Sequence, residues 1–286
     1  MNSRYRKILC VVFLLAIFLV STSAVWAKTC PVDGEEFPDE FAFCPKHGKK
    51  LVDSGGGESA TETDPVTGMS FVWVEGGCFE MGSVRGKDDE KPVHKVCVDG
   101  FWMGKFEVTQ GEWEKVMGTN PSTFKGSDRP VDHVSWNDAQ EFIARLNQNT
   151  GKRYGLPTEA QWEFAARGGV KSNGFEYAGS NVVNEVAWYK ANSGGATIPV
   201  GRKLPNELGL YDMSGNVWEW CQDWASNNYY RWSPSENPSG PESGSFRVFR
   251  SGAYNSPPDY VSASHRYWGE PDWRQSNNGF RLVRAE

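Results

Sequence analysis

Two short Cys-Pro-x-x-Gly segments near the amino end have the residue types and spacing of a small metal site. The first places Asp33 three residues after Cys30, and the second places His47 three residues after Cys44. Structural zinc is held mostly by Cys and His and less often by a carboxylate. These four residues predict a zinc-ribbon-like module over residues 28–52 that could bind zinc. A Cys30–Cys44 disulfide is the alternative in an oxidising compartment.

Of the four other cysteines, Cys10 lies in the apolar run near the amino end and three follow the module. Cys78 and Cys97 flank a short acidic loop between two strand-like stretches, so we expect a disulfide between them. Cys221 lies between Trp220 and Gln222 in an aromatic segment. That setting predicts a buried structural thiol rather than a reactive one.

A glycine-containing turn offers two carboxylates to a hard cation. Asp212 and Glu219 flank Gly215 in this turn. Carboxylates and turn carbonyls are the ligands that calcium prefers, at ~2.3–2.6 Å. The alternative is a structural turn whose polar groups satisfy one another.

Other reactive side chains form no pattern in the sequence. His94, His133 and His265 are scattered, and no two of them have the helical spacing of a metal-binding pair. Ser256 has no nearby base, so a hydrolytic triad is unsupported.

The elements that must position these residues are short. Alternating apolar residues predict strands around 71–82, 95–107, 246–251 and 279–284. Helix-capping residues predict three helix starts, at Thr109, Ser135 and Thr158. Short helices in a β framework define an α+β fold.

Composition agrees with a loop-rich protein whose core is built from rings. The 286 residues include 31 Gly, 16 Pro and 13 Trp, which favours many turns and large aromatic contacts. The formal net charge is −6 and no basic stripe is present, which argues against a nucleic-acid partner.

The amino end reads as an export signal. Basic residues precede a 13-residue apolar run, Ile8 to Val20, and small residues follow up to Ala27. Because a bilayer span needs about 20 apolar residues, we expect a cleaved signal peptide over 1–27, with an uncleaved anchor as the alternative. The protein is then secreted or periplasmic, without a membrane span after cleavage. A flexible linker is expected over 53–68 and one domain over 69–286.

Five segments resemble, in order, the motifs of the sulfatase-modifying factor family, whose founder is the formylglycine-generating enzyme. They are FEVTQGEW at 106–113, PVDHVSW at 130–136, LPTEAQWEFAARG at 156–168, GLYDMSGNVWEW at 209–220 and NGFR at 278–281. The resemblance covers 69–286. It implies a C-type-lectin-like, formylglycine-generating-enzyme fold that is α+β and loop-rich, with little regular secondary structure.

The resemblance also implies an activity that this chain departs from. The family oxidises a sulfatase cysteine to formylglycine with copper and oxygen, and two cysteines near the carboxyl end hold the copper. Ser256 and Val261 stand at the matching positions here. Neither can supply the soft thiolate that binds copper(I), so copper is not expected.

The family's calcium motif is better preserved. By resemblance, the ligands would be the side chains of Asp212 and Glu219 with the carbonyls of Gly215 and Val217. A second family site would fall near residues 184 and 192, where the pattern is too loose to assign ligands. We therefore expect calcium at the turn.

The stretch 253–276 is rich in Tyr, Trp, Ser and Asn, as binding loops are. By resemblance it surrounds the family's substrate groove, and it is similar to the variable region of retroelement-diversified receptor proteins. The residues expected to bind a ligand are Tyr254, Tyr260, His265, Trp268 and Trp273.

These observations favour a binding or accessory module over an enzyme. The expected partner is an extracytoplasmic peptide, protein or glycan. One alternative is an oxidoreductase of the same family with altered chemistry. The other is a genuine sulfatase-activating formylglycine generator that uses Cys221, which has no second thiol nearby in the sequence.

Overall fold

The computed structural model describes residues 27–29, 36–38, 41, 43–46, 52–53 and 59–285. The chain divides into two compact units, residues 1–57 and 58–286. Among the described residues, no helix is long and apolar enough to cross a membrane. The predicted signal segment lies outside them except for its last residue, Ala27.

The smaller unit contains a three-stranded antiparallel sheet. Strand β1 (Ala27–Thr29) lies between β2 (Glu36–Pro38) and β3 (Val52–Asp53). Cys44 is buried and packs with Phe37. Short strands around a small buried centre suit either a metal or a covalent link.

The other three predicted zinc ligands are Cys30, Asp33 and His47, and they lie outside the described residues. Cys44 alone does not distinguish zinc from a disulfide. The zinc-ribbon-like module therefore stays a prediction.

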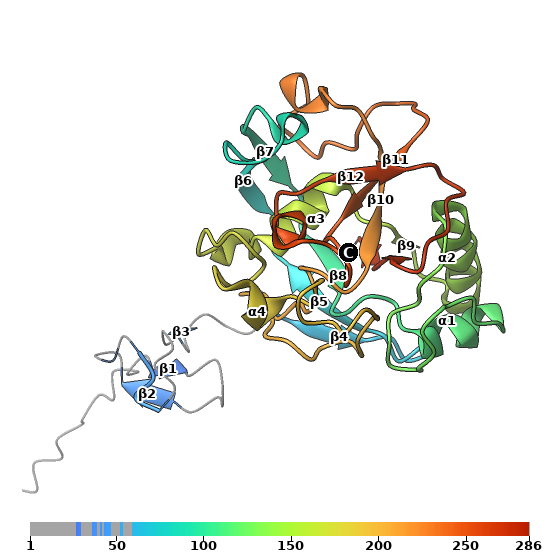
Figure 1. Ribbon diagram of the computed structural model, residues 1–286, viewed down its shortest axis with the longest axis horizontal. Coiled ribbons are helices and arrows are strands. Elements are labelled where there is room, and N and C mark those ends of the chain that lie inside the picture. Colours follow the sequence, from blue (N-terminus) through green and yellow to red (C-terminus); the bar gives the residue numbers. More distant parts are fainter. Residues whose placement is uncertain are drawn as a thin grey trace, which may run out of the picture. The chain divides into compact units, whose positions relative to one another are not determined.

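The larger unit is built on two sheets and a hairpin (Figure 1). The five-stranded antiparallel sheet contains, in spatial order, β4 (Thr61–Thr63), β5 (Ser70–Val74), β8 (Phe101–Gly104), β14 (Val283–Arg284) and β9 (Tyr154–Gly155). The four-stranded sheet contains β12 (Tyr267–Gly269), β11 (Arg247–Arg250), β10 (Trp218–Trp224) and β13 (Asn278–Gly279). The hairpin joins β6 (Gly77–Met81) to β7 (His94–Val98).

Helices are few and short in this unit, as the resemblance implies. The α-helices are α1 (Gln110–Met117), α2 (Trp136–Thr150), α3 (Glu159–Ala166) and α4 (Val183–Val186). The single-turn 3-10 helices are η1 (Asp88–Glu90), η2 (Gly169–Lys171), η3 (Tyr229–Arg231) and η4 (Pro258–Val261). The α+β, loop-rich fold class is confirmed.

The three predicted helix starts are also confirmed. Thr109, Ser135 and Thr158 each cap a helix, and each accepts a hydrogen bond from the backbone N–H three residues later. Helix α2 ends at Gly151, whose φ of 71° suits glycine. Local hydrogen bonds of this kind depend on neighbouring residues, which is why the sequence reveals them.

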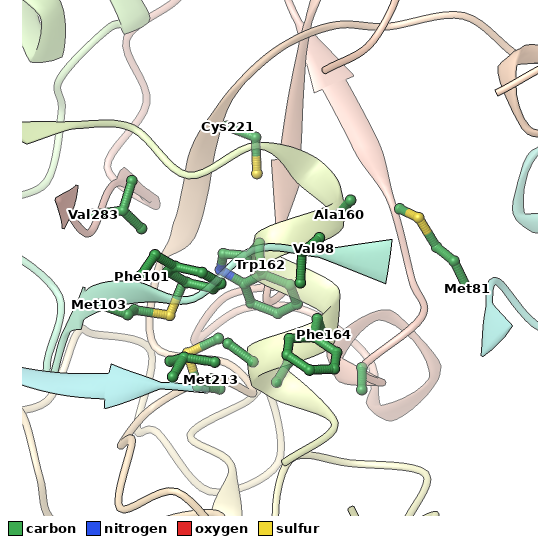
Figure 2. Packing of buried hydrophobic residues seen from close by; sticks show 14 of the residues in the cluster. Met81, Val98, Phe101, Met103, Ala160, Trp162, Phe164, Met213, Cys221 and Val283 are labelled. Atoms are coloured by element: carbon green, nitrogen blue, oxygen red, sulfur yellow. The ribbon is translucent and has the colours of Figure 1, made fainter. Parts of the chain in front are cut away.

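Aromatic rings fill both sides of the four-stranded sheet. On one side, α3 carries Trp162 and Phe164 into a cluster that includes Phe101 and Cys221 (Figure 2). On the other side, the ring of Trp220 stacks on a neighbouring strand's Phe249 at 3.6 Å between centroids. The ring-built core expected from composition is present.

The predicted linker is wrong for residues 59–68. Strand β4 pairs with β5 within this range, and Asp64 is buried. Asp64 accepts hydrogen bonds from the backbone N–H groups of Val66 and Thr67 and from the hydroxyl of Tyr154. Side-chain hydrogen bonds order this polar segment, so apolar periodicity gives no sign of it.

The predicted Cys78–Cys97 disulfide is confirmed, with an S–S distance of 2.07 Å. The two cysteines face each other across β6 and β7.

Removing the disulfide should destabilise the domain. Because it closes a loop of 19 residues, the Cys78→Ala/Cys97→Ala variant should lose about 3 kcal/mol of unfolding free energy in urea titrations. Wild type under strong reductant serves as the comparison and should unfold at the same urea concentration as the variant. A loss below about 1 kcal/mol would contradict the expected loop constraint.

Candidate functional site

Strand β10 divides the site into two faces, because successive side chains of a strand point to opposite sides. Cys221 lies in the cluster around Trp162, whereas Trp218 and Trp220 belong to the cluster around α1 and α2. The side chains of Glu219, Cys221 and Asp223 therefore lie on one side of the sheet. The indoles of Trp218, Trp220 and Trp224 lie on the other.

The indole side continues into a partly exposed surface, which we call the aromatic face. It consists of Trp136, Trp224, Arg247, Tyr267 and Trp273. Tyr267 is 40% exposed and Trp273 is 39% exposed, whereas the other three are half-buried. Its residues come from β10, β11 and β12, from the first residue of α2 and from the loop after β12, and the three strands lie side by side in Figure 1.

Arg247 forms the centre of the aromatic face. Its guanidinium carbon lies 3.4 Å from the ring centroid of Trp224 and 3.9 Å from that of Trp136. Its Nη1 donates to the carbonyl of Gln222 at 2.6 Å, and Trp136 Nε1 donates to the carbonyl of Cys221 at 3.0 Å. Two rings and one hydrogen bond thus fix the guanidinium plane.

Trp273 is held in place by a small residue on the neighbouring strand. A Cβ atom at Gly269 would lie 2.4 Å from the Trp273 ring and 2.8 Å from the Phe249 ring. Only glycine allows the indole to approach the sheet this closely. The loop that carries Trp273 is also tied to α2, since Arg274 makes two hydrogen bonds to Asp138 at 2.6 and 2.7 Å.

The residues predicted to bind a ligand do not form one exposed surface. Trp273 is exposed, Tyr260 and Trp268 are half-buried, and Tyr254 and His265 are buried. The Tyr254 hydroxyl lies 3.1 Å from Ser276 Oγ, and His265 Nδ1 lies 3.4 Å from a carboxylate oxygen of Glu90. These two side chains hold loops together.

Sequence reasoning missed Tyr267, Arg247 and the two other indoles of the face. Tyr267 lies opposite Phe249 in the sheet register, and its ring is 5.5 Å from that of Trp218. The signal available in the sequence was the alternation of β10 and β11. Reading it required knowing which strands pair.

The two positions that the resemblance assigns to copper ligands are both buried. The Ser256 hydroxyl oxygen accepts a hydrogen bond from the backbone N–H of Ala253 at 3.0 Å. Val261 packs in an apolar cluster with Val186 and Ala187. Neither the serine nor the valine side chain offers a thiolate.

Cys221 is a buried thiol of the core, as predicted. It has no disulfide partner among the described residues and is 0% exposed, in the cluster that surrounds Trp162 (Figure 2). Burial raises the pKa of this thiol well above its usual value, and the nearby Asp223 acts in the same direction. A protonated thiol without access to solvent is neither a good nucleophile nor a good copper ligand.

The predicted calcium turn has a different partner for its glutamate. Glu219 is fully buried, and its two carboxylate oxygens accept hydrogen bonds from Arg281 Nη2 and Nε, each at 2.7 Å. Trp162 Nε1 also donates to Glu219, at 2.7 Å. The guanidinium therefore balances the charge that a calcium ion would balance.

The rest of the turn is mostly satisfied as well. The Gly215 carbonyl accepts from Ser251 Oγ at 2.9 Å, and Asp212 Oδ2 accepts from the Gly201 N–H at 2.7 Å. Asp212 Oδ1 is buried and has no hydrogen-bond partner. Within the described part of the chain, no three His, Cys, Asp or Glu residues group as metal ligands. Asp212, Gly215, Val217 and Glu219 thus do not fit a calcium ion as they stand.

The same cluster contains an acidic residue that sequence reasoning missed. Glu107 is buried and accepts hydrogen bonds from Asn216 Nδ2 and the Val217 N–H. Burial, with the neighbouring charge of Asp212, raises the pKa of Glu107 well above its usual value. Burial also raises the pKa of Asp212 to about 6.

The loosely assigned second family site does bring its two residues together. Asn192 Nδ2 lies 3.5 Å from Asn184 Oδ1, and the Tyr189 hydroxyl donates to the same oxygen at 2.9 Å. These amides bond to protein groups, and no carboxylate is among the partners found there. This arrangement matches a structural turn.

Chelation provides a direct test of the calcium turn. Because Arg281 already neutralises Glu219, treatment with EDTA should leave the melting temperature of the protein unchanged within about 1 °C, measured by calorimetry. A fall in melting temperature that calcium reverses and zinc does not would contradict this expectation. Magnesium serves as the control cation.

A second network of buried charges supports the core side of the sheet. Glu159 accepts from Arg266 Nη2 at 2.6 Å and from Arg250 Nη1 at 3.0 Å. Arg250 also donates to Glu163 at 2.7 Å. Asp223 lies beside this network, where its Oδ2 accepts from the Glu159 N–H, and burial raises its pKa to about 8.

This network gives the stability a pH dependence. Folded protein keeps a proton on Asp223 up to about pH 8, whereas the unfolded chain releases it near pH 4. Rising pH between these values therefore favours unfolding, by at most about 1.4 kcal/mol per pH unit. Glu90 has the opposite sign, because hydrogen bonds lower its pKa to about 2 and its contribution is lost below about pH 4.

We therefore expect the free energy of unfolding to peak near pH 4–5 and to decline toward pH 8. Urea titrations across pH 3–9 measure it. The Asp223→Asn variant keeps the hydrogen-bond acceptor and should flatten the decline. An unchanged slope in that variant would contradict the assignment to Asp223.

Fold and site together define an α+β, loop-rich domain with a buried, charge-paired turn and an aromatic face. The profile of the sulfatase-modifying factor enzyme 1-like domain matches residues 57–286. The chain belongs to this family.

Known relatives agree with this assignment. The chaperone protein LppX of Paenibacillus barcinonensis is 35% identical over 82% of this chain and 97% of its own length. The formylglycine-generating enzyme of Mus musculus is 30% identical over 77% of this chain and 76% of its own. The solved structure of Treponema denticola variable protein 1 has a TM-score of 0.74 and 30% identity, covering 80% of this chain and 99% of that one.

Proposed function

We propose that this protein is an exported binding protein of its family that does not oxidise cysteine, and that it holds extended segments of a protein partner on its aromatic face. One observation carries the proposal. Tyr267 on β12 and Trp273 in the loop after it are partly exposed on one face, while the positions that the resemblance assigns to copper-binding thiols hold Ser256 and Val261.

The rigidity of the face supports binding rather than adaptation. Two strands, a glycine contact and the Arg274–Asp138 pair fix Tyr267 and Trp273 before any ligand arrives. Aromatic side chains lose little conformational entropy on contact and supply large apolar area. Pre-organised rings of this kind are typical centres of protein interfaces.

The relatives support a protein partner over a glycan. One relative that this chain matches along nearly its whole length is named a chaperone protein. A chaperone acts on other polypeptides, so a segment of polypeptide is the ligand we propose here.

Variants of the face test the proposal. We expect the Tyr267→Ala/Trp273→Ala double variant to lose partners that the wild type retains from the envelope fraction, quantified by mass spectrometry. Trp232→Ala is the matched control, since Trp232 is 55% exposed and lies outside the face. Each partner so found is then titrated, as purified protein, against the wild type and both variants.

The proposal requires that the double variant bind a purified partner at least tenfold more weakly than the wild type does, and that Trp232→Ala bind it as the wild type does. Equal affinity in all three proteins would overturn it, as would retention of glycans in place of proteins.

A peptide assay tests the enzymatic alternatives. The mature protein, incubated with a sulfatase-type cysteine peptide, copper and oxygen, should leave the peptide mass unchanged. Conversion of the cysteine to formylglycine would overturn the non-oxidase assignment. A family member with intact cysteines is the positive control.

A further inference from the structure

We infer that Arg247 makes the aromatic face selective for acidic peptide segments that also carry an aromatic side chain. This inference rests on the proposed function and adds the chemistry of the partner. Three observations support it: Arg247 has no carboxylate partner among the described residues, two rings enclose its guanidinium, and β12 forms the edge of the sheet.

Arg247 differs from other arginines of the same region in having no carboxylate partner among the described residues. Arg274 is paired with Asp138, and Arg250 is paired with Glu159 and Glu163. The single hydrogen bond found for Arg247 goes to a backbone carbonyl, and its Nε is buried without a partner. A positive charge therefore remains uncompensated at the centre of the face.

The neighbouring carboxyl group of Asp223 does not neutralise the positive charge of Arg247. Asp223 is the carboxyl whose charge acts on Arg247, and its raised pKa of about 8 keeps it mostly neutral at pH 7. Partial burial lowers the pKa of Arg247 itself, because the rings displace water from the guanidinium. A poorly hydrated cation gains more from an incoming anion than a fully hydrated one does.

The stacking geometry determines how an anion can bind. The indoles of Trp136 and Trp224 lie close to the guanidinium carbon. An anion can therefore accept hydrogen bonds only from the N–H groups at the edge of the guanidinium plane. That edge matches the two oxygens of a carboxylate.

The strand beside Arg247 can accept an extended segment. Strand β12 ends the four-stranded sheet, and no further backbone hydrogen bonds to Tyr267, Trp268 or Gly269 are found elsewhere in the described chain. Exposed strand edges bind peptides by adding a strand.

Register then sets the spacing of the ligand's side chains. Gly269 lies opposite Arg247, and Tyr267 lies two residues away on the same strand. Side chains two apart on an added strand point to the same face, about 7 Å from each other. One would contact Tyr267, and the next would lie beside Gly269 and Trp273, on the same face of the sheet as Arg247.

Labelled peptides test this selectivity by fluorescence polarisation. The probes are fluorescein-Gly-Ser-Trp-Ser-Glu-Ser-Gly-amide and the same peptide with Gln in place of Glu, so that the glutamate is the one carboxylate of the peptide. Wild type should bind the Glu peptide at least tenfold more tightly than the Gln peptide. Arg247→Met should reduce that ratio to less than twofold, because it weakens binding of the Glu peptide more than binding of the Gln peptide.

Two more variants keep the test decisive. Arg247→Lys retains the charge but not the planar fork, so it should keep part of the Glu preference even if Arg247→Met folds poorly. Arg145→Met removes an exposed arginine of α2 with the same change in net charge and should behave as wild type.

The outcomes separate the two ideas. If the Tyr267→Ala/Trp273→Ala variant loses both peptides but neither the Glu-to-Gln change nor Arg247→Met matters, the selectivity is overturned and the binding function stands. If the double variant binds both peptides as wild type does, the aromatic face is not the binding site and both ideas fall. If wild type binds neither peptide, the inferred ligand is wrong.

Discussion

Replacing Arg281 by methionine should lower the free energy of unfolding by about 3–5 kcal/mol, because it removes the cation from a buried acidic cluster. Arg281 is 0% exposed and pairs with both oxygens of Glu219. It also donates to the carbonyls of Gly104 and Tyr211. Without it, the buried carboxylates of the cluster repel one another and two carbonyls lose a donor.

The measurement is urea unfolding at pH 7 followed by tryptophan fluorescence. Arg284→Met is the matched control three residues along the chain, because Arg284 is 15% exposed and its partner Glu62 is 37% exposed. Pairs of that exposure contribute at most about 1 kcal/mol. Equal losses in the two variants would show that Arg281 contributes no more than a surface arginine.

Replacing Glu159 by glutamine should be comparably severe, at about 3–5 kcal/mol. Glu159 is 2% exposed and accepts from both Arg250 and Arg266, so its charge is shared by two buried guanidinium groups. Glutamine keeps the size but not the charge, and it leaves Glu163 as the remaining carboxylate bonded to Arg250.

A double variant separates charge imbalance from lost packing. Glu159→Gln with Arg266→Met removes one charge of each sign, so its loss should be smaller than the sum of the two single losses by at least about 1 kcal/mol. Glu141→Gln on the exposed side of α2 is the control and should change stability by less than about 0.5 kcal/mol. Strict additivity would contradict a direct coupling of Glu159 to Arg266.

These two clusters explain why a loop-rich chain keeps a fixed aromatic face. Glu219 and Asp223 lie on the same side of β10: Glu219 is bonded to Arg281, between β13 and β14, and Asp223 accepts from the backbone N–H of Glu159 in α3. These bonds hold β10 on one side, and the opposite side of the same strand carries the indoles. A rigid support of this kind keeps the rings in position for binding.

Much of the fold could be predicted from the sequence, because the signals are local. Thr109, Ser135 and Thr158 start helices through hydrogen bonds to residues three positions away. The Cys78–Cys97 disulfide joins two adjacent strands of one hairpin. The segment 59–68 was mispredicted because its order depends on Tyr154, far along the chain.

The sequence by itself determined the family and the fold class, since both depend on residue types at fixed positions. Only the tertiary structure decided that Glu219 faces Arg281, and that Arg247 lies between Trp136 and Trp224 without a carboxylate. Those facts depend on which strands pair and on which side of a strand is buried. Distant parts of the chain settle both when they pack together.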